Sequence, residues 1–263
     1  TVYVNRPPVA DFIYSPETIY NDTTVIFQNL SYDPDGDPLT YVWRYRKPGS
    51  QSWTLFSGAK NPKRIFQKGT WEISLTVNDG YESVTTIKTI NVQNRAPIAD
   101  FYYSPTTVYN DTDVTFTNTS RDPDGDSLTY KWEYRKPNSS EWVQFSTTKD
   151  SNKVLDQIGN WTIRLTAIDE DGANDSVTKN ITVQNRKPEL IVEYSPENPY
   201  EGDKVNICIT VEDADKHKSN IDLYIQKEGE SKENVASWEK VDSGITVCYT
   251  FTPDEPVRYD IEV

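Results

Sequence analysis

Apolar and polar residues alternate along most of this chain, in runs of five to eight positions separated by turn residues. A period of two is the signature of a strand with one buried and one solvated face. The clearest runs are Val25/Phe27, Leu39/Tyr41/Trp43, Trp53/Leu55 and Trp71/Ile73/Leu75/Val77. Asn, Asp, Pro or Gly residues bound each run, as expected of turns between short strands. The pattern predicts an all-β fold of two-sheet sandwiches.

The chain also repeats itself. The segment from Asn5 that reads NRPPVADFIYSP returns without a gap at Asn94 as NRAPIADFYYSP, and roughly two residues in three stay identical through LTYVW and LTYKW. A third copy begins at Asn185 as NRKPELIVEYSP and soon diverges. Repetition at this period indicates tandem units of one supersecondary design. We therefore expect three immunoglobulin-like domains, at residues 5–93, 94–184 and 185–263.

Within the first unit the runs assign seven strands of a sandwich. In order these are strand A near Phe12, B at 24–28, C at 40–47, C′ at 53–56, E at 63–67, F at 71–77 and G at 85–93. Trp43 and its repeat Trp132 lie on strand C, where immunoglobulin-like cores commonly bury a tryptophan.

These motifs resemble those of a known family. The NRPPVADFIYSP entry, the SYDPDGDPLTYVW step and the closing TWEISLTVNDG are similar to PKD domains, which are immunoglobulin-like modules of archaeal, bacterial and some eukaryotic surface proteins. The resemblance covers units one and two and the entry strand of unit three. It implies an extracellular β-sandwich array. The chain departs from the family at WRYRKPG and WEYRKPN, where PKD domains usually read WDFGDG.

The ends of the chain suggest strands without partners. TVYV at residues 1–4 matches the ends of G strands, and unit three stops at RYDIEV, its expected F strand. We expect a piece of a longer array, with residues 1–4 closing a preceding unit and the third unit lacking its last strand. The alternative is a donor-strand link, in which residues 1–4 of one subunit complete the third domain of another in a filament.

Charge excludes one class of partner. The net charge is −14, from 41 acidic and 27 basic residues, and no run of Lys and Arg supplies the contacts that phosphate neutralisation requires. Nucleic acid is not an expected partner. No apolar run approaches the roughly 20 residues of a membrane span.

Acidic residues are concentrated in a repeated DPDGD loop. Three carboxylates at alternate positions repel one another unless a cation or several N–H donors compensate, and Ca²⁺ accepts six to eight oxygens in flexible geometry. In a sandwich of this order the loop faces the FG loop and the incoming linker, which carries Asn5 in unit one and Asn94 in unit two. We therefore predict Ca²⁺ sites at domain junctions. The predicted ligands are Asp33, Asp35, Asp37 and Asp79 in unit one, and Asp122, Asp124, Asp126, Asp169 and Asp171 in unit two.

The alternative is that Asp, Pro and Gly simply form turns, with Asp33 and Asp122 accepting hydrogen bonds from the backbone. Unit three keeps only Glu212, Asp213 and Asp215 and is the weakest candidate.

Two kinds of covalent modification are expected. Eight Asn-x-Ser/Thr acceptor sites for N-linked glycans lie in units one and two, at Asn21, Asn29, Asn110, Asn118, Asn138, Asn160, Asn174 and Asn180. Cys208 and Cys248 fall in presumed strands B and E of unit three, which are neighbours in this fold, so they can form a cross-strand disulfide in an oxidising compartment.

Catalytic patterns are absent from the sequence. The lone histidine, His217, lies in a polar loop and is expected to be solvated, and no nucleophile, zinc or phosphate motif occurs. Trp53, Trp142, Tyr45 and Tyr134 are candidates for an exposed stacking platform, or else for packing against their own sheet.

The combined expectation is a non-catalytic extracellular array that spaces, stiffens or assembles a surface layer, filament or adhesin on an archaeal or bacterial envelope. Its partners would be copies of itself or other surface proteins. The alternative is an accessory module of a secreted hydrolase that binds a polysaccharide or protein polymer through its Trp and Tyr residues.

Overall fold

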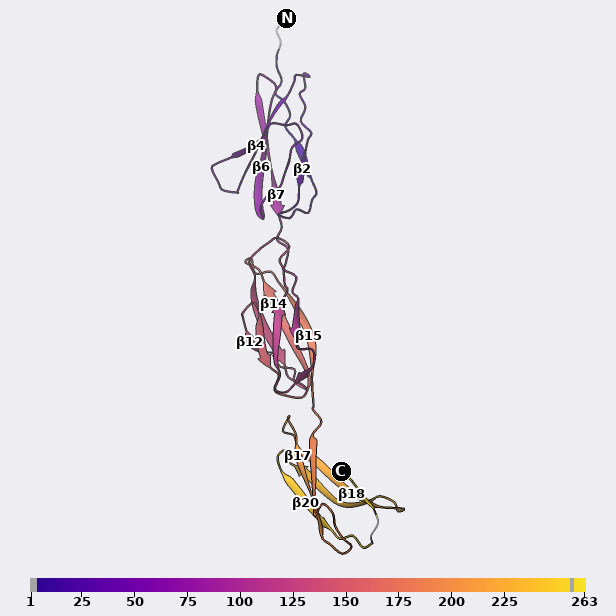
Figure 1. Cartoon of the computed structure of the whole chain (residues 1–263). Coiled ribbons are helices and arrows are strands. Elements are labelled where there is room, and N and C mark those ends of the chain that lie inside the picture. The colour runs from indigo at the N-terminus through magenta and orange to yellow at the C-terminus, as the bar shows by residue number, and fades with distance from the viewer. Residues whose placement is uncertain (1–3, 256–257) are drawn as a thin grey trace.

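The computed structural model describes residues 4–255 and 258–263, and the described residues form three β-sandwich units placed end to end (Figure 1). Residues 1–3 of the expected TVYV strand lie outside them. The described part of the chain has no helix, and thus no helix long and apolar enough to cross a membrane. The all-β prediction is confirmed.

Unit one pairs a three-stranded sheet with a four-stranded sheet. The first has the order β1 (Phe12–Ser15), β2 (Val25–Asn29) and β5 (Lys63–Arg64). The second has the order β4 (Thr54–Ser57), β3 (Thr40–Arg46), β6 (Gly69–Asn78) and β7 (Ser83–Val92). Ile19 bridges Val92 in parallel, so the segment after β1 closes the edge beside β7.

Unit two repeats this order. One sheet contains β8 (Phe101–Ser104), β10 (Asp113–Asn118) and β13 (Ser151–Val154). The other contains β12 (Val143–Ser146), β11 (Thr129–Arg135), β14 (Gly159–Ile168), β15 (Asn174–Gln184) and, parallel to β15, the short β9 (Val108–Tyr109).

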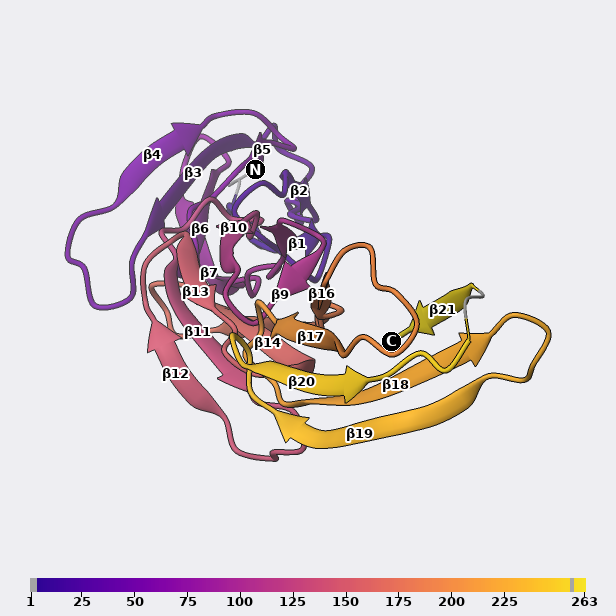
Figure 2. The same cartoon turned by 60° about the horizontal axis from the view of Figure 1, so that its bottom comes forward.

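Unit three has two three-stranded sheets. They are β16 (Glu189–Ser195), β17 (Val205–Glu212) and β20 (Thr246–Phe251), and β19 (Glu233–Val241), β18 (Ser219–Lys227) and β21 (Tyr259–Glu262). The long β18 and β19 project to the side of the first two units (Figure 2). Within the described residues no strand pairs with the outer edge of β21, which is where β7 and β15 lie in the other units.

Each of the first two cores is built around the predicted tryptophan. Trp43 is 0% exposed, its ring centroid lies 5.0 Å from that of Phe12, and its Nε1 donates to the carbonyl of Ala59 at 2.9 Å. Trp132 repeats these contacts with Phe101 and the carbonyl of Thr148. Because the indole N–H has a partner, burial adds apolar area without an unsatisfied donor. Truncating either residue to Ala is expected to cost about 3–5 kcal/mol.

Strand E differs from the sequence expectation, and Tyr45 follows the packing alternative. Strand E was predicted to run to Gln67, but β5 ends at Arg64, because the chain then leaves the sheet and Phe66 enters the core with 3% exposure. Tyr45 is on the core side of β3 and packs on Phe66 and Trp71, whereas Trp53 stacks with Arg46 from the other side of that strand. Adjacent residues on a strand face opposite ways, so Tyr45 and Arg46 cannot share a surface.

Candidate cation sites at the domain junctions

The DPDGD loops fold around their first aspartate. Asp33 Oδ1 accepts the backbone N–H groups of Asp35 at 2.7 Å and Asp37 at 3.2 Å. Gly36 adopts φ 84°, which a side-chain-bearing residue rarely does. Asp122 holds its loop in the same way, through Asp124 at 2.7 Å and Asp126 at 3.2 Å. One carboxylate oxygen of each first aspartate is thus used in the turn.

The central aspartate of each loop binds an arginine of the linker. Arg6 donates from Nε and Nη2 to Asp35 Oδ1 at 2.8 and 2.6 Å, and its backbone N–H donates to Oδ2 at 2.8 Å. Hydrogen bonds from the Arg6 side chain and backbone hold the pKa of Asp35 below its usual range. Such charge-assisted pairs are among the stronger hydrogen bonds in proteins.

The same pair recurs in the other units. Arg95 Nη2 lies 2.6 Å from Asp124 Oδ1, and Arg186 Nη1 lies 2.7 Å from Asp215 Oδ1. Both of these carboxylate side chains are 0% exposed. In all three units the arginine precedes its aspartate by 29 residues. The sequence interpretation counted Asp35 and Asp124 as metal ligands and missed the arginines. The repeated Asn-Arg at a fixed distance from the acidic loop was the available signal.

The linker asparagines reach the FG loops. Asn5 Nδ2 donates to Asp79 Oδ2 at 3.0 Å, and Asn94 Nδ2 donates to Asp169 Oδ2 at 2.7 Å. Asp79 and Asp169 are 4% and 5% exposed. Backbone N–H donation from Glu82 and then the Asn5 amide lower the pKa of Asp79. Burial acts to raise the pKa of Asp169, but the Asn94 amide and the N–H of Ala173 outweigh it, so this pKa also lies below its ordinary value.

The acidic loops and linkers of units one and two contain buried oxygens without a hydrogen-bond partner among the described residues. These are Asn5 Oδ1 and Asp33 Oδ2 in unit one, and Asn94 Oδ1 and Asp122 Oδ2 in unit two. An unsatisfied buried oxygen costs free energy, and a native protein usually satisfies it with a donor, water or ion. The same two oxygens are unsatisfied in both units, which indicates a shared feature of the site.

Further carboxylates lie close to these atoms. In unit two, oxygens of Asp122, Asp126 and Asp169 lie within 4.8 Å of one another, and in unit one a different set, Asp33, Asp35 and Asp37, does so. Amide and carboxylate oxygens at this separation suit a hard cation such as Ca²⁺, which tolerates irregular loops better than Mg²⁺ does. The donor set therefore fits Ca²⁺.

Lys68 of unit one enters the unit-two site from across the junction. Its Nζ lies 2.6 Å from Asp126, 2.5 Å from Asp171 and 3.1 Å from Glu170. Hydrogen bonds to Asp126 and then Asp171 raise the pKa of Lys68 above its ordinary value. Asp171, a predicted ligand, is thus paired with this ammonium. The corresponding residue of unit two is Ile158, so the second junction has no such lysine.

A second set of contacts joins consecutive units. Arg95 Nη2 lies 3.1 Å from Asp22 and its guanidinium lies 4.8 Å from the Tyr20 ring, while Asn21 donates to the carbonyl of Asp124 at 2.7 Å. The Tyr-Asn-Asp turn of one unit therefore holds the Arg-Asp pair of the next.

The second joint uses equivalent residues. Arg186 contacts Asp111 at 2.5 Å and the Tyr109 ring at 4.2 Å, and Asn110 donates to the carbonyl of Asp215 at 3.3 Å. Hydrogen bonding to Arg186 lowers the pKa of Asp111.

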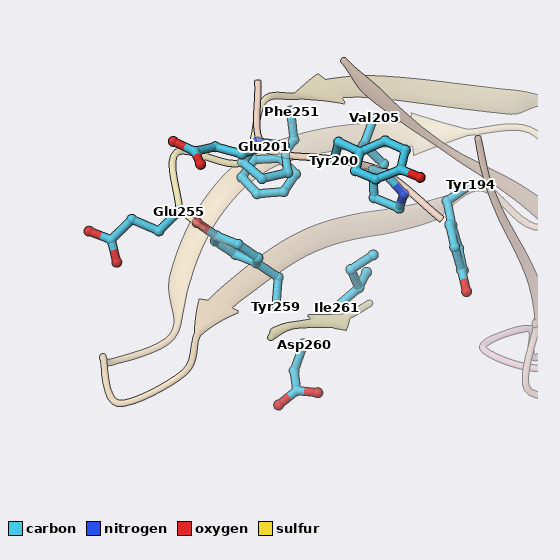
Figure 3. A pocket seen from close by; sticks show the side chains of 11 residues that line it. Tyr194, Tyr200, Glu201, Val205, Phe251, Glu255, Tyr259, Asp260 and Ile261 are labelled. Atoms are coloured by element: carbon cyan, nitrogen blue, oxygen red, sulfur yellow. The ribbon is translucent and has the colours of Figure 1, made fainter. Parts of the chain in front are cut away.

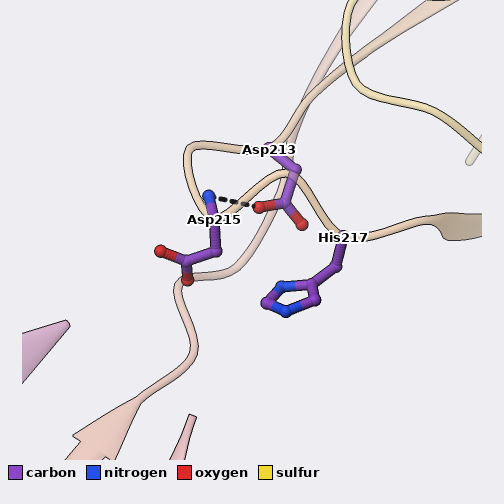
Figure 4. Close-up of side chains that lie close together, drawn as sticks. All are labelled: Asp213, Asp215 and His217. Atoms are coloured by element: carbon purple, nitrogen blue, oxygen red, sulfur yellow. Dashed lines mark hydrogen bonds between the residues drawn. The ribbon is translucent and has the colours of Figure 1, made fainter. Parts of the chain in front are cut away.

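The acidic loop of unit three is reduced. Asp213, Asp215 and His217 have ligand atoms within 4.8 Å of one another, and Asp213 Oδ1 accepts the N–H of Asp215 at 2.7 Å (Figure 4). Asp215 is committed to Arg186, His217 is exposed, and Glu212 lies outside the cluster. The described residues of unit three include no FG loop to face it.

The aromatic residues predicted from the sequence, Trp53, Trp142, Tyr45 and Tyr134, do not form an exposed platform. Trp53 is half-buried beneath the Arg46 guanidinium at 4.3 Å, and Trp142 is contacted by Arg135 at 4.6 Å and Arg164 at 4.0 Å. Tyr134 packs with Phe145 and Trp161 beside the unit-two core. The packing alternative considered from the sequence describes these residues better.

The glycan acceptor sites fall into three groups. Asn29 and Asn118 are 8% and 6% exposed, and each Oδ1 accepts a backbone N–H two residues ahead. Asn21 and Asn110 use their Nδ2 atoms at the joints. The exposed acceptors are all in unit two, at Asn138, Asn160, Asn174 and Asn180.

Cys208 of β17 and Cys248 of β20 lie directly opposite each other and are joined by a disulfide of 2.12 Å. The bond joins two neighbouring strands of the same sheet. It therefore differs from the inter-sheet bridge of antibody domains.

Comparison with known proteins agrees with the repeat analysis. The family model described as PKD domain matches residues 5–93 and 94–184, together more than half of the chain. Chitinase A of Pseudoalteromonas piscicida is 28% identical over 191 residues, which cover 69% of this chain but only 22% of the chitinase.

Two solved structures are also similar. The PKD1 domain of Vibrio anguillarum Epp is 25% identical and covers 35% of this chain and 98% of its own, with a TM-score of 0.28. Carbohydrate-binding modules of the β-sandwich superfamily are 17% identical and cover 62% of this chain and 87% of theirs, with a TM-score of 0.30. Assignment to a family rests on the sequence match and not on these superpositions. The chain belongs to the PKD domain family.

Proposed function

We propose that this chain is a non-catalytic structural array whose domain junctions are stiffened by bound Ca²⁺. PKD domains together with a disulfide are typical of extracellular accessory or structural modules. The location we propose is the surface of an archaeal or bacterial cell, in a surface layer, filament or adhesin stalk, with N-linked glycans on exposed acceptors. Its partners would be copies of itself or other surface proteins.

The observation that carries the cation proposal is the repeated pair of buried, partnerless oxygens. Asn94 Oδ1 and Asp122 Oδ2 in unit two match Asn5 Oδ1 and Asp33 Oδ2 in unit one. In the proposed site these oxygens, with Asp126 and Asp169, hold the ion in unit two. Asp33, Asp37 and Asp79 with Asn5 do so in unit one.

The mechanical role follows from where the ligands lie. Asn94 is in the linker and directly precedes Arg95, which contacts Asp22 of unit one. A bound ion would hold Asn94 against two loops of unit two, the loop between β10 and β11 and the loop between β14 and β15. It would thereby fix the linker at the residue where the chain passes between units. Bending at the joint then requires loss of an ion ligand, which makes the rod stiffer with Ca²⁺ than without it.

The experiment uses the full chain. Titration calorimetry should detect Ca²⁺ binding, and calorimetric melting in Ca²⁺ and in EGTA should give a higher melting temperature with Ca²⁺. Small-angle X-ray scattering in the same two buffers should give a narrower range of overall dimensions with Ca²⁺. Asp122→Asn with Asp33→Asn removes both carboxylates, and Asp156→Asn, at an exposed ion pair with Lys136, is the matched control. Absence of binding, or equal melting of all variants in both buffers, would overturn the proposal.

A second candidate is an accessory module of a secreted hydrolase that binds a polymer. The similarity to part of Chitinase A favours it. Co-sedimentation with chitin and other insoluble polymers tests it, because Trp53→Ala and Trp142→Ala should abolish retention if those rings bind sugar. Under the structural reading neither variant changes retention, since arginines already cover both rings.

A further inference from the structure

Unit two carries an arginine that has no acidic partner among the described residues. Arg135 lies on β11 beside Tyr134, whose ring packs on the core, so the Arg135 side chain is on the outer face of the sheet. Its Nε is buried and has no hydrogen-bond partner in the part of the chain that the structure describes. A buried guanidinium N–H without an acceptor costs free energy, which a bound anion would recover.

Unit one shows what occupies the equivalent place. Arg46 is the repeat of Arg135, and its Nε donates to Glu72 Oε2 at 2.6 Å across the β3–β6 pair. The residue opposite Arg135 is Thr162, whose hydroxyl donates to Asn180 Oδ1 at 3.1 Å. Unit two therefore keeps the guanidinium and lacks the carboxylate that satisfies it in unit one.

The acid beside Arg135 on this face is used by other cations. Glu133, two residues earlier on β11, lies 2.6 Å from Lys131 Nζ and 2.6 Å from Arg164 Nη2. It is 5% exposed, and Arg164 Nε also donates to it at 2.8 Å. Three basic side chains thus accompany one carboxylate here, although the net charge of the whole chain is −14. The patch is locally basic on an acidic chain.

Trp142 brings two of the guanidinium groups together. Arg135 lies 4.6 Å and Arg164 lies 4.0 Å from the centroid of its ring. In unit one the matching Trp53 stacks with Arg46, which is already paired with its acid. Stacking restricts the Arg135 side chain before any ligand arrives, so less conformational freedom is lost when a planar carboxylate binds.

We propose that Arg135 is the centre of a carboxylate-binding site on unit two, and that its ligand is an acidic polysaccharide whose sugars carry uronic acids. A carboxylate placed as Glu72 is in unit one would accept hydrogen bonds from the fork of the guanidinium. The hydroxyls of Thr162 and Thr178, which pair with Arg135 and Arg164 across the strands, can donate to and accept from the hydroxyls of a sugar ring. The proposal is independent of the proposed Ca²⁺ sites.

The position within the sheet favours a polysaccharide over an acidic peptide. β11 pairs with both β12 and β14, and β14 pairs with both β11 and β15, so these strands have no free main-chain edge. A peptide that adds as a strand needs such an edge. Recognition at this place depends on side chains alone, which suits the hydroxyl and carboxylate groups of a sugar.

The acidic loop of unit two does not prevent binding of an anion. It precedes β11, whose seven residues put about 20 Å between the two ends of the strand. At physiological ionic strength, exposed charges more than about 8 Å apart are largely screened from each other. The basic side chains next to the ligand therefore dominate the local field.

The pocket of unit three does not offer the same chemistry. It has a volume of about 620 Å³, and its described lining includes Glu201, Glu255 and Asp260 but no lysine or arginine (Figure 3). Carboxylates there would repel an acidic ligand. A uronic acid is therefore expected to bind to unit two and not in that pocket.

The test titrates a galacturonic acid trimer into the full chain in EGTA, so that Ca²⁺ cannot bridge acidic groups. Titration calorimetry and saturation-transfer NMR should show one bound trimer per chain. The fully methyl-esterified trimer has the same sugars without the charge, and it should not bind. A Glu-Gly-Glu peptide is the third probe and should bind more weakly than the acidic trimer. Failure of the acidic trimer to bind, equal binding of its ester, or binding of the peptide at least as tight as that of the trimer overturns the proposal.

Variants of the chain locate the site. Arg135→Gln should weaken binding about ten-fold or more, because it removes a charge-assisted pair. Lys136→Gln removes the same charge at an exposed ion pair with Asp156, and as the matched control it should bind like the parent chain. Equal losses in the two variants would mean that overall charge attracts the trimer, and so would overturn the proposal.

A reciprocal exchange between the repeats tests the place of the carboxylate. Thr162→Glu should abolish binding, because its side chain would occupy the site as Glu72 does in unit one. Glu72→Thr should free Arg46 and raise the stoichiometry from one trimer to two. If Arg135→Gln lowers the melting temperature, the Thr162→Glu chain decides, since it adds an ion pair. Unchanged affinity of the Thr162→Glu chain, or a single bound trimer on the Glu72→Thr chain, overturns the proposal.

Discussion

The carboxylate of Asp124 is fully buried against the guanidinium of Arg95, with Nη2 2.6 Å from Oδ1. The same arginine extends to Asp22 and the Tyr20 ring of the preceding unit. Hydrogen bonding to Asp124 raises the pKa of Arg95, so the side chain stays charged. One residue thus holds both the acidic loop and the joint.

We expect Arg95→Lys to loosen the first joint. Lysine carries the same charge but lacks the planar fork that donates to Asp124 while it stacks on Tyr20. Distances between spin labels in units one and two should become more broadly distributed, with an altered mean. Arg258→Lys, at an exposed pair with Asp260 in unit three, is the control. A distribution as narrow as that of the parent chain would mean that the joint does not depend on the guanidinium.

Much of this arrangement could be predicted from the sequence. Repetition marked the two segments that the PKD family model matches, alternation placed Trp43 and Trp132 in their cores, and the order of strands brought the acidic loop, the FG loop and the linker to one pole. These inferences succeeded because they rest on local periodicity and a connectivity rule that many sandwiches share.

Other features could not be obtained this way. Asp35 and Asp124 each pair with an arginine that lies 29 residues earlier in the chain. Lys68 pairs with Asp126 of the next unit. Such contacts are set by tertiary geometry and not by the local sequence. The sequence left both a platform and packing open for Tyr45, because grouping it with Trp53 ignored which face of the strand each side chain occupies. The structure supports packing.

Lys68→Gln should strengthen Ca²⁺ binding by unit two. The ammonium neutralises Asp126 and Asp171 in the proposed site, so its loss leaves more negative charge for an added cation. Titration calorimetry should show a several-fold lower dissociation constant for one of the two sites, together with a looser joint in EGTA. Lys60→Gln, at an exposed position, provides the control. A weaker or unaltered affinity would count against Asp126 as a ligand.

Acid should weaken the junctions. The pKa values of Asp79 and Asp169 are lower in the folded chain than the ordinary value of 3.8. Groups with depressed folded pKa values contribute stability that is complete above the unfolded pKa and is lost as pH falls through the folded value. Protonation of these two carboxylates should therefore not change the melting temperature between pH 7 and pH 5. Below about pH 4 it should lower the melting temperature.

The double variant Asp79→Asn with Asp169→Asn isolates this contribution. It cannot gain a proton at either position, so its melting temperature should change less between pH 5 and pH 3 than that of the parent chain. Identical pH profiles would show that neither carboxylate is linked to folding.

Glycan occupancy should follow the exposure of each acceptor. In a glycosylating host, peptide mass spectrometry should find glycans at Asn138, Asn160, Asn174 and Asn180. It should not find them at Asn29 or Asn118, whose buried side chains hold turns. Asn118→Ala should destabilise unit two by about 1–3 kcal/mol because the N–H of Ser120 loses its acceptor. Asn174→Ala is the matched control, and glycans on the buried pair would contradict the assignment.

Reduction should destabilise unit three alone. Cys208 and Cys248 are 40 residues apart, and a cross-link over a loop of that length typically stabilises a domain by about 2–4 kcal/mol, largely by restricting the unfolded chain. Units one and two contain no cysteine, so their transitions provide an internal control in the same calorimetric trace. Dithiothreitol, or Cys208→Ser with Cys248→Ser, should lower only the unit-three transition. A parallel fall in all three transitions would mean that the units unfold as one cooperative body, which is incompatible with an array whose members are coupled only through their joints.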